Sequence, residues 1–186
     1  MANVRAKLTG IGGDVLFPYT PLVNYSQSVN YNPYDLVHTN YTTYAYSGTP
    51  SPTLQVTGEF TNTTDEEIKH TAFCIHLLRQ WSKMNYGIND GAAGTPPPLL
   101  TFNYGGMYPN IPVLLSDFSV VQDNQVDQME STTVGLGVGD TENAWAMSVV
   151  NTITVTLLVH RNPQEQKEQF TKRQFANGDL YRSGWI

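Results

Sequence analysis

The side chains that most often perform catalysis or hold metals are few in this sequence and poorly spaced. Four histidines occur: His38, His70, His76 and His160. His70 and His76 share one predicted helix, but a separation of six residues puts them on different faces. No His-Glu-x-x-His motif occurs, and the single cysteine, Cys74, excludes both a pair of cysteine ligands and an internal disulfide. The pattern predicts no metal site and no cofactor.

Two glycine-rich stretches and Cys74 suggest other chemistry. Residues 10–13 read GIGG and residues 135–139 read GLGVG. Neither stretch is followed by Lys-Ser/Thr or lies in a βαβ pattern, so we interpret both as flexible loops and not as phosphate-binding loops. Cys74 lies in the middle of an amphipathic pattern, where a thiol packs as a small buried hydrophobe. We expect no enzymatic activity.

The acidic residues have an unusual distribution. Between Met84 and His160 the chain has seven carboxylates and no lysine or arginine. Each of these acids, taken alone, is typical of a solvated loop. The one-signed run as a whole predicts a surface that repels nucleic acid. The spacing of Asp123, Asp127 and Glu130 matches no calcium-binding loop.

The composition favours a protein that lives in contact with other proteins. The chain has 186 residues, enough for one domain, and its charged share is 14%, against about 25% in ordinary soluble proteins. Tyr, Asn, Thr, Ser and Gln replace the missing charge. The net charge of −6 argues against a nucleic-acid clamp. We see no signal peptide and no run of about 20 apolar residues, so we expect a cytosolic protein that is later assembled, without a membrane partner.

The strongest predicted element is an amphipathic helix over residues 64–86. Thr64 and Glu67 form a capping box, acidic residues fill the first turn, and Gly87 is the expected stop. Two adjoining apolar stripes predict that the helix packs against a sheet: Ile68, Ala72, Ile75 and Leu78 form the first, and Phe73, Leu77, Trp81 and Met84 the second.

Alternating apolar and polar residues predict several strands. Residues 54–60 form the first, residues 99–105 a short second, and residues 112–121 a third with Leu114, Phe118 and Val120 on one side. The stretch WAMSVVNTITVTLLVHRNP, residues 145–163, predicts one long last strand, in which Ile153, Val155, Leu157 and Val159 oppose Thr152, Thr154 and Thr156. A long polar loop is expected over residues 122–144.

The two ends of the chain look different from its middle. Residues 1–50 form an N-terminal segment rich in Tyr and Asn. Its residues 27–50, rich in Tyr, Asn and Thr, are typical of disorder or of exposed strands, and we prefer strands and loops. In the C-terminal arm, residues 162–186, Asn162 and Pro163 predict the start of a short helix that ends before Gly178. Its apolar content is low, which favours a docking role over a core role.

Four stretches together resemble a known family. They are FPYTPLVNYS (17–26), LQVTGEFTNTTDEEIKHTAFCIHLLRQWSKMNYG (54–87), GTPPPLLTFNYGGMYPNIPVLLSDFSVV (94–121), and the closing strand with NPQEQKEQFTKRQFANG (162–178). Their order, with a helix followed by Gly-Thr-Pro-Pro-Pro as the most specific part, resembles the baseplate tube proteins, or tail-tube initiators, of contractile-tailed bacteriophages. Residues 27–50 and 122–144 have no match in that pattern.

The resemblance implies a mainly β (α+β) tail-tube fold. That fold is a β-sandwich or barrel with one packed helix, here over residues 64–86, and residues 1–186 would form a single domain. It implies a homo-hexameric ring in the virion tail, assembled in the host cytoplasm. The ring connects the baseplate hub to the major tail tube and templates tube polymerisation. The implied partners are adjacent tube rings, the major tail tube protein, hub and wedge proteins, the tape measure protein and, in transit only, DNA.

Within this family reading, two groups of residues are candidates for function. The candidate lumen-facing acids are Asp123, Asp127, Glu130, Asp140 and Glu142, and the candidate inter-subunit contacts are Tyr25, Tyr31, Tyr34, Tyr41, Tyr44, Phe170, Phe175 and Trp185. The alternating threonines of residues 152–156 suit a wet lumen. The alternatives are a major tail tube subunit, another tail ring protein and, outside this class, a β-sandwich carbohydrate-binding module.

Overall fold

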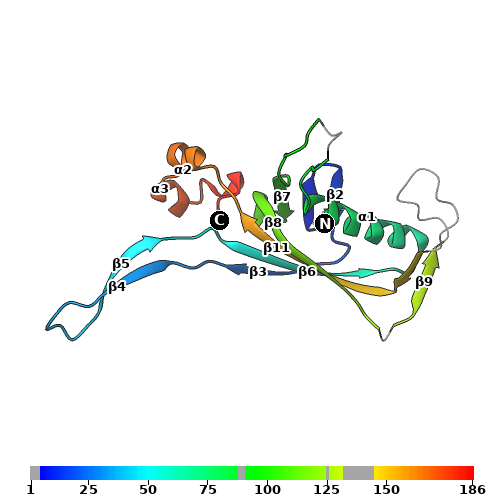
Figure 1. Cartoon of the computed structure of the whole chain (residues 1–186), viewed down its shortest axis with the longest axis horizontal. Coiled ribbons are helices and arrows are strands. Elements are labelled where there is room, and N and C mark those ends of the chain that lie inside the picture. The colour runs from blue at the N-terminus through cyan, green and yellow to red at the C-terminus, as the bar shows by residue number, and fades with distance from the viewer. Residues whose placement is uncertain (1–4, 88–90, 125, 132–144) are drawn as a thin grey trace.

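The computed structural model describes residues 5–87, 91–124, 126–131 and 145–186 (Figure 1). These residues form a mainly β protein with one long helix and three short helical segments. The strands are β1 (Lys7–Gly10), β2 (Gly13–Leu16), β3 (Leu22–Ser26), β4 (Asn30–Tyr34), β5 (Thr43–Gly48), β6 (Thr53–Thr61), β7 (Leu100–Tyr104), β8 (Tyr108–Gln122), β9 (Gln128–Ser131), β10 (Trp145–Ser148) and β11 (Val150–Val159). The helices are α1 (Asp65–Trp81), α2 (Pro163–Gln169), α3 (Lys172–Ala176) and the 3-10 turn η1 (Tyr181–Ser183).

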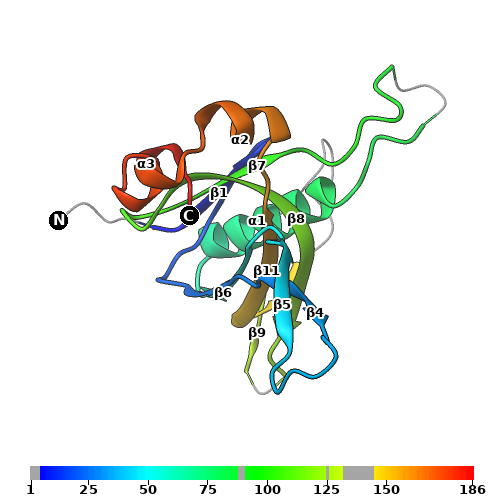
Figure 2. The same ribbon diagram turned by 90° about the vertical axis from the view of Figure 1, so that its left-hand side faces the viewer.

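Seven strands form one open antiparallel sheet in the order β2-β1-β7-β8-β11-β6-β3. Two further pairs, β4 with β5 and β9 with β10, extend beyond it. The mainly β class predicted from the sequence is confirmed. The described residues close no barrel, because β2 and β3 each pair with a neighbour on one side only. Instead the sheet curls around α1, with β1 and β7 above the helix and β6 below it in Figure 2.

Helix α1 begins as predicted and ends earlier. The Thr64 side chain accepts a hydrogen bond from the Glu67 backbone N–H, and the Glu67 carboxylate accepts one from the Thr64 N–H. The last helical residue is Trp81, not a residue near Gly87. The chain leaves the helix because the Asn85 backbone pairs with the loop that follows, donating to the Thr95 carbonyl at 3.1 Å.

The first apolar stripe of α1 is buried as predicted, whereas only two of the four residues of the second stripe are buried. Leu77 and Trp81 are buried, but Phe73 and Met84 are exposed. Met84 is exposed because it lies beyond the end of the helix. The exposed Phe73 ring flanks the β1–β2 turn at Gly13. The buried face is therefore narrower than the sequence suggested.

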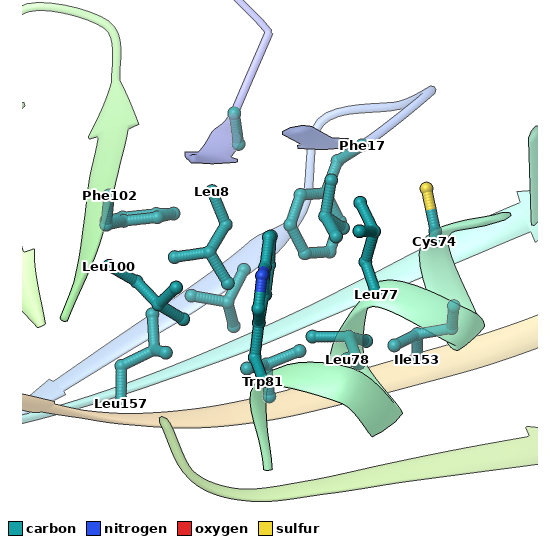
Figure 3. Close-up of a cluster of buried hydrophobic side chains, with 14 of the residues drawn as sticks. Leu8, Phe17, Cys74, Leu77, Leu78, Trp81, Leu100, Phe102, Ile153 and Leu157 are labelled. Atoms are coloured by element: carbon teal, nitrogen blue, oxygen red, sulfur yellow. The ribbon is translucent and has the colours of Figure 1, made fainter. Parts of the chain in front are cut away.

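The core lies between α1 and the concave face of the sheet (Figure 3). Trp81 is its largest fully buried side chain, and the indole N–H donates to the Ile11 carbonyl at 2.7 Å. This bond fastens the β1–β2 turn, whose glycines adopt φ angles of 93° at Gly12 and 153° at Gly13. The GIGG stretch, expected to be a flexible loop, is thus a tight hairpin turn held by the helix. The GLGVG stretch lies outside the described residues.

Strand β8 contains an irregularity that changes which side chains face the core. Asp117 pairs with Thr156 and Leu115 pairs with Leu157, so Ser116 is an extra residue in β8. A bulge of this kind reverses the alternation of side chains. Leu115 and Phe118 therefore pack against the core, whereas Leu114 points to the opposite face. The prediction that Leu114 shares a side with Phe118 and Val120 was wrong for this reason.

The predicted last strand is divided in two, and part of the predicted loop forms a strand. Strand β11 has the predicted alternation of buried aliphatic residues and partly exposed threonines. Val149 separates it from β10, which pairs with β9 in the region expected to be a polar loop. The Val149 N–H donates to the Asp127 carbonyl at 3.0 Å, which holds the small β9–β10 sheet at its base.

The C-terminal arm starts where the sequence predicted and contains one more helix than expected. Asn162 caps α2 by accepting from the Gln164 N–H at 3.0 Å. Thr171 caps α3 in the same way, which divides the predicted single helix at Phe170. Among the described residues, no helix is long and apolar enough to cross a membrane.

Two glycines offer a matched test of this core. Gly58 of β6 faces the Phe17 ring, which occupies the space that a side chain would need, whereas a side chain at Gly48 of β5 would meet nothing within 4 Å. We expect Gly58→Ala to lower the free energy of unfolding by about 1–3 kcal/mol, the usual cost of an overpacked core. Urea denaturation measures the change. A Gly48→Ala variant that loses as much as Gly58→Ala would contradict the packing described here.

Candidate functional site: the uncovered sheet face and the tyrosine hairpin

The two faces of the sheet have different cover. Helix α1 and the C-terminal arm both lie on one face, above the sheet in Figure 1. The other face of β8, β11, β6 and β3 is covered by no described element. Because side chains alternate along a strand, the register between these strands defines which residues this uncovered face presents.

Cross-strand pairing gives the uncovered face four rows. The first holds Val121, Thr152 and Glu59, the second Ser119, Thr154, Thr57 and Leu22, the third Asp117, Thr156, Gln55 and Asn24, and the fourth Leu114, Leu158, Thr53 and Ser26. Hydroxyl and amide groups dominate, and the hydroxyls of Thr57 and Thr154 lie 3.2 Å apart at hydrogen-bond distance. None of these residues is a lysine or an arginine, and two of them, Glu59 and Asp117, are carboxylates.

The edge of this face is free for further pairing. Strand β3 pairs with β6 on one side, and its other side pairs with no described strand. Leu22, on the uncovered face of β3, is 72% exposed. An unpaired edge strand next to an exposed aliphatic side chain is a usual place for contact with another chain.

The predicted lumen-facing acids do not gather on this uncovered face. Asp123 follows β8, Asp127 precedes β9, and Glu130 lies within β9, so all three are at one end of the elongated molecule (Figure 1). All three are exposed. Asp140 and Glu142 lie outside the described residues. That any of these acids faces a lumen stays a prediction.

Sequence reasoning missed the two carboxylates that the uncovered face does carry. The alternation of residues 54–60 could have found Glu59, which shares a side with Gln55 and Thr57. Asp117 could have been found in the same way, because it alternates with Phe118 and Val120, whose register the bulge at Ser116 leaves unchanged. The uncovered face is therefore acidic through different residues from those predicted.

A buried polar cluster holds the acidic end of the molecule to the core. The side-chain amide of Asn62 donates to the Ser148 backbone carbonyl at 2.8 Å. The Thr71 hydroxyl of α1 donates to the side-chain oxygen Oδ1 of Asn62 at 2.7 Å. The Asn151 amide donates to the same Ser148 carbonyl at 2.9 Å. These bonds join β6, α1, β10 and β11, so the β9–β10 sheet is anchored at its base.

Residues 27–50, named the tyrosine hairpin below, project from the opposite end of the molecule (Figure 1). Among the described strands, β4 and β5 pair only with each other, and nearly every side chain is exposed. Of the predicted contact residues, Tyr31, Tyr34, Tyr41 and Tyr44 lie here, and each is more than half exposed. Tyr46 of β5 is also 64% exposed, and its ring packs edge-on against Tyr31.

The fifth predicted tyrosine lies apart from the tyrosine hairpin. Tyr25 belongs to β3 and points to the covered face, where burial raises the pKa of its hydroxyl. That hydroxyl donates to the Gln27 side-chain oxygen at 2.6 Å. Tyr25 therefore lies at the base of the hairpin, next to the C-terminal arm.

The predicted contact residues of the C-terminal arm meet one another. The Phe170 ring lies 5.7 Å from that of Phe175 and 5.2 Å from that of Trp185. The Arg161 guanidinium stacks on the Trp185 ring at 4.6 Å. Phe170 and Phe175 each keep about two fifths of their surface exposed (40% and 42%), so the cluster is both an internal packing unit and an exposed surface.

Two cavities adjoin this aromatic cluster and share Phe175, Trp185 and Ile186. The first, about 590 Å³, lies between the C-terminal arm and the base of the tyrosine hairpin at Tyr46 and Pro50. The second, about 400 Å³, is lined mainly by aromatic and aliphatic residues, among them Tyr25, Met107 and Tyr181. The two cavities together are named the C-terminal groove below.

Cys74 and His70 are used in packing, whereas His38, His76 and His160 are exposed. Cys74 is fully buried, and burial raises the pKa of its thiol to about 12. The His70 ring nitrogen Nε2 donates to the Leu16 carbonyl at 2.9 Å, and the ring stacks on Phe60. Within the described residues, no group of three or more His, Cys, Asp or Glu side chains is placed to hold a metal.

Cys74 provides a direct test of this packing. Because thiolates are the reactive form, a thiol with a raised pKa and no exposure reacts slowly. We expect a thiol reagent at pH 8 to leave the folded protein unmodified and to modify one thiol per chain in urea. Mass spectrometry of the intact protein checks this outcome. Stoichiometric modification of the folded protein would show that α1 does not bury Cys74 as described.

No protein-family model matches this chain, and no curated protein matches it. The uncovered sheet face, the tyrosine hairpin and the C-terminal groove, together with the resemblance in sequence, are therefore the features from which function is inferred.

Proposed function

We propose that this chain is a structural subunit of the baseplate tube of a contractile-tailed bacteriophage. In this proposal, copies of the chain form a hexameric ring that connects the baseplate hub to the major tail tube. The ring templates polymerisation of that tube and contributes to the channel for the tape measure protein and DNA. The observation that carries the proposal is the uncovered, hydroxyl-rich face of β8, β11, β6 and β3.

The chemistry of the uncovered face suits the wall of a DNA channel. Phosphate groups bind to proteins chiefly through lysine and arginine, and none of the residues in the four rows is either. Glu59 and Asp117 add a weak repulsion toward a polyanion. The threonine and serine hydroxyls keep the wall hydrated. A strand of DNA would therefore pass this face without being held by it.

The arrangement of the sheet suits ring formation. A face that lines a channel needs its other face covered, and α1 and the C-terminal arm supply that cover on one side only. A ring also needs strand edges that neighbouring copies satisfy, because closure removes exposed edges. The free edge of β3 next to Leu22 is such an edge. The open sheet of one copy would then become a sector of a larger assembly.

Two other functions use some of the same features. A major tail tube subunit, or another tail ring protein, would share the uncovered face and differ from the baseplate tube protein in copy number per particle. A carbohydrate-binding module is favoured by the exposed tyrosines, since sugars stack on aromatic rings. It would need no ring, so oligomeric state separates it from the tube proteins.

The first measurement is the native mass of the purified protein, alone and with its neighbouring tail proteins. We expect six-fold rings with a central hole, on their own or on a hub template, in electron micrographs. A 20.7 kDa monomer that joins no ring with those partners present would contradict the proposal. Binding of that monomer to a glycan array would then favour the carbohydrate-binding module.

A cation placed on the uncovered face tests its role as a channel wall. Ser119 is exposed in the second row of this face, and Gln80 is exposed on α1 on the covered side. We expect rings of Ser119→Lys to retain a short linear DNA duplex at low salt, because each copy adds a phosphate-binding group to the lumen. Rings of the wild type and of Gln80→Lys should retain little.

Gel electrophoresis of the rings with labelled duplex measures this retention. Equal retention by the Gln80→Lys and Ser119→Lys rings would show that the uncovered face does not line the channel.

A further inference from the structure

The tyrosine hairpin lacks what normally stabilises a pair of strands. An isolated two-stranded hairpin is marginally stable in water, and a third strand or a packed helix is usually required. Here β4 pairs only with β5, and no described element covers either face of the pair. At the tip, Val37 is 82% exposed and Tyr41 is 88% exposed. Ordinary exposed loops carry polar side chains at such positions, whereas this tip exposes an aliphatic and an aromatic side chain.

The tip of the hairpin exposes apolar side chains that no described residue covers. Leu36, Val37 and Tyr41 are 58%, 82% and 88% exposed. A few apolar and aromatic anchors of this kind usually carry most of the binding energy of a protein contact.

The C-terminal groove offers a surface of matching chemistry on the same chain. Its second cavity is lined by Tyr25, Met107, Phe175 and Tyr181, with Trp185 and Ile186. Aromatic and methionine side chains of this kind receive aromatic and aliphatic groups well. Apart from the residues that line it, no described part of the same chain occupies the groove.

Charge also matches between the two surfaces. Residues 27–50 contain one carboxylate, Asp35 at the tip, and no lysine or arginine. The region from Arg161 to the end of the chain contains five cations against three carboxylates, and Lys172, Arg173 and Arg182 flank the groove residues Phe175 and Tyr181. Asp35 would therefore meet a surface of opposite charge.

The tip cannot reach the groove of its own chain. The base of the hairpin, at Tyr46 and Pro50, lines the first cavity. Strands β4 and β5 then lead away from the C-terminal arm, and at about 3.3 Å per residue the six residues of β5 alone span roughly 20 Å. The tip therefore lies at the far end of the hairpin from the groove of its own chain, so the two can meet only between two copies.

We propose that the tip of the tyrosine hairpin, residues 35–42, binds in the C-terminal groove of a second copy of this chain. Leu36, Val37 and Tyr41 enter the groove beside Trp185, and Asp35 faces the cations of α3 and η1. The contact joins two different surfaces, so it is heterologous and propagates around a ring or along a stack. This inference rests on the proposed function and adds to it a second contact between copies, besides the edge of β3.

Cross-linking tests this contact directly and without reliance on activity. Because Cys74 is buried, cysteines introduced at Val37 and at Tyr181 would be the reactive thiols. Two differently tagged proteins, one Val37→Cys and the other Tyr181→Cys, are mixed and treated with a bismaleimide. We expect a covalent dimer that contains both tags. A mixture of Ile11→Cys and Tyr181→Cys is the matched control, because Ile11 is 70% exposed on the β1–β2 turn, away from the tip.

Substitutions at the tip test its contribution to assembly. We expect Val37→Asp to raise the concentration needed for half-maximal assembly about tenfold or more, while Ile11→Asp has little effect. Asp35→Lys alone should weaken assembly, and its combination with Lys172→Asp and Arg173→Asp should restore it. Sedimentation velocity measures each effect. Circular dichroism confirms that each variant keeps its fold.

The outcomes separate this inference from the proposed function. Normal rings from Val37→Asp, with no 37–181 cross-link, would overturn the hairpin contact and leave the ring proposal standing. A 37–181 cross-link between monomers or dimers that never form a ring would support the hairpin contact and count against the ring. Covalent dimers that carry one tag only, from 37–37 or 181–181 links, would show that the tip does not meet the groove and would also overturn the inference.

Discussion

The packing of α1 against one face of the curled sheet is the constraint on which the rest of the structure depends. Trp81, Leu77 and Leu78 fill the space between the helix and the strands, and the Trp81 indole fastens the β1–β2 turn. With this face filled, the residues that the structure describes provide no second layer for the other face of β8, β11, β6 and β3. That face is therefore open to water or to another molecule. Its threonines, serines and amides are compatible with water. The tyrosine hairpin and the aromatic cluster of the C-terminal arm expose more apolar surface and are less compatible with water.

Much of the fold could be predicted because its signals are local. The Thr64–Glu67 capping box, the alternation of β6 and β11, and the Asn162 cap each depend on residues a few positions apart. The end of α1 depends on a backbone bond between Asn85 and Thr95, which no local pattern reveals. The bulge at Ser116 and the pairing of β9 with β10 also depend on partners distant in sequence. The bulge is also the reason why Leu114 was assigned to the wrong side of β8.

The functional residues group differently in space from the way they group in the sequence. The acids after residue 122 attracted attention as a run, yet the described ones lie at one end of the molecule. The tyrosines and the C-terminal aromatic residues lie more than 100 residues apart in the sequence and were predicted together as inter-subunit contacts. In the structure they lie at the two sides of one region, since the base of the tyrosine hairpin and the C-terminal arm line the same cavity. Strand pairing and side-chain burial, which the sequence alone does not reveal, bring these distant residues together on one surface.

The continuity between the tyrosine hairpin and the main sheet has a mechanical consequence. Strand β4 follows β3 and β5 leads into β6, so the hairpin is an extension of two strands of the central sheet. Strand β6 pairs with β11 along its whole length from Thr53 to Thr61. In antiparallel sheets the hydrogen bonds lie perpendicular to the strands. A pull on the hairpin along its length would therefore load these bonds in shear, all at once, and would not open them one by one like a zipper. The hairpin is thus attached through β6, which pairs with β11 on one side and β3 on the other, so it can transmit a pulling force to the central sheet.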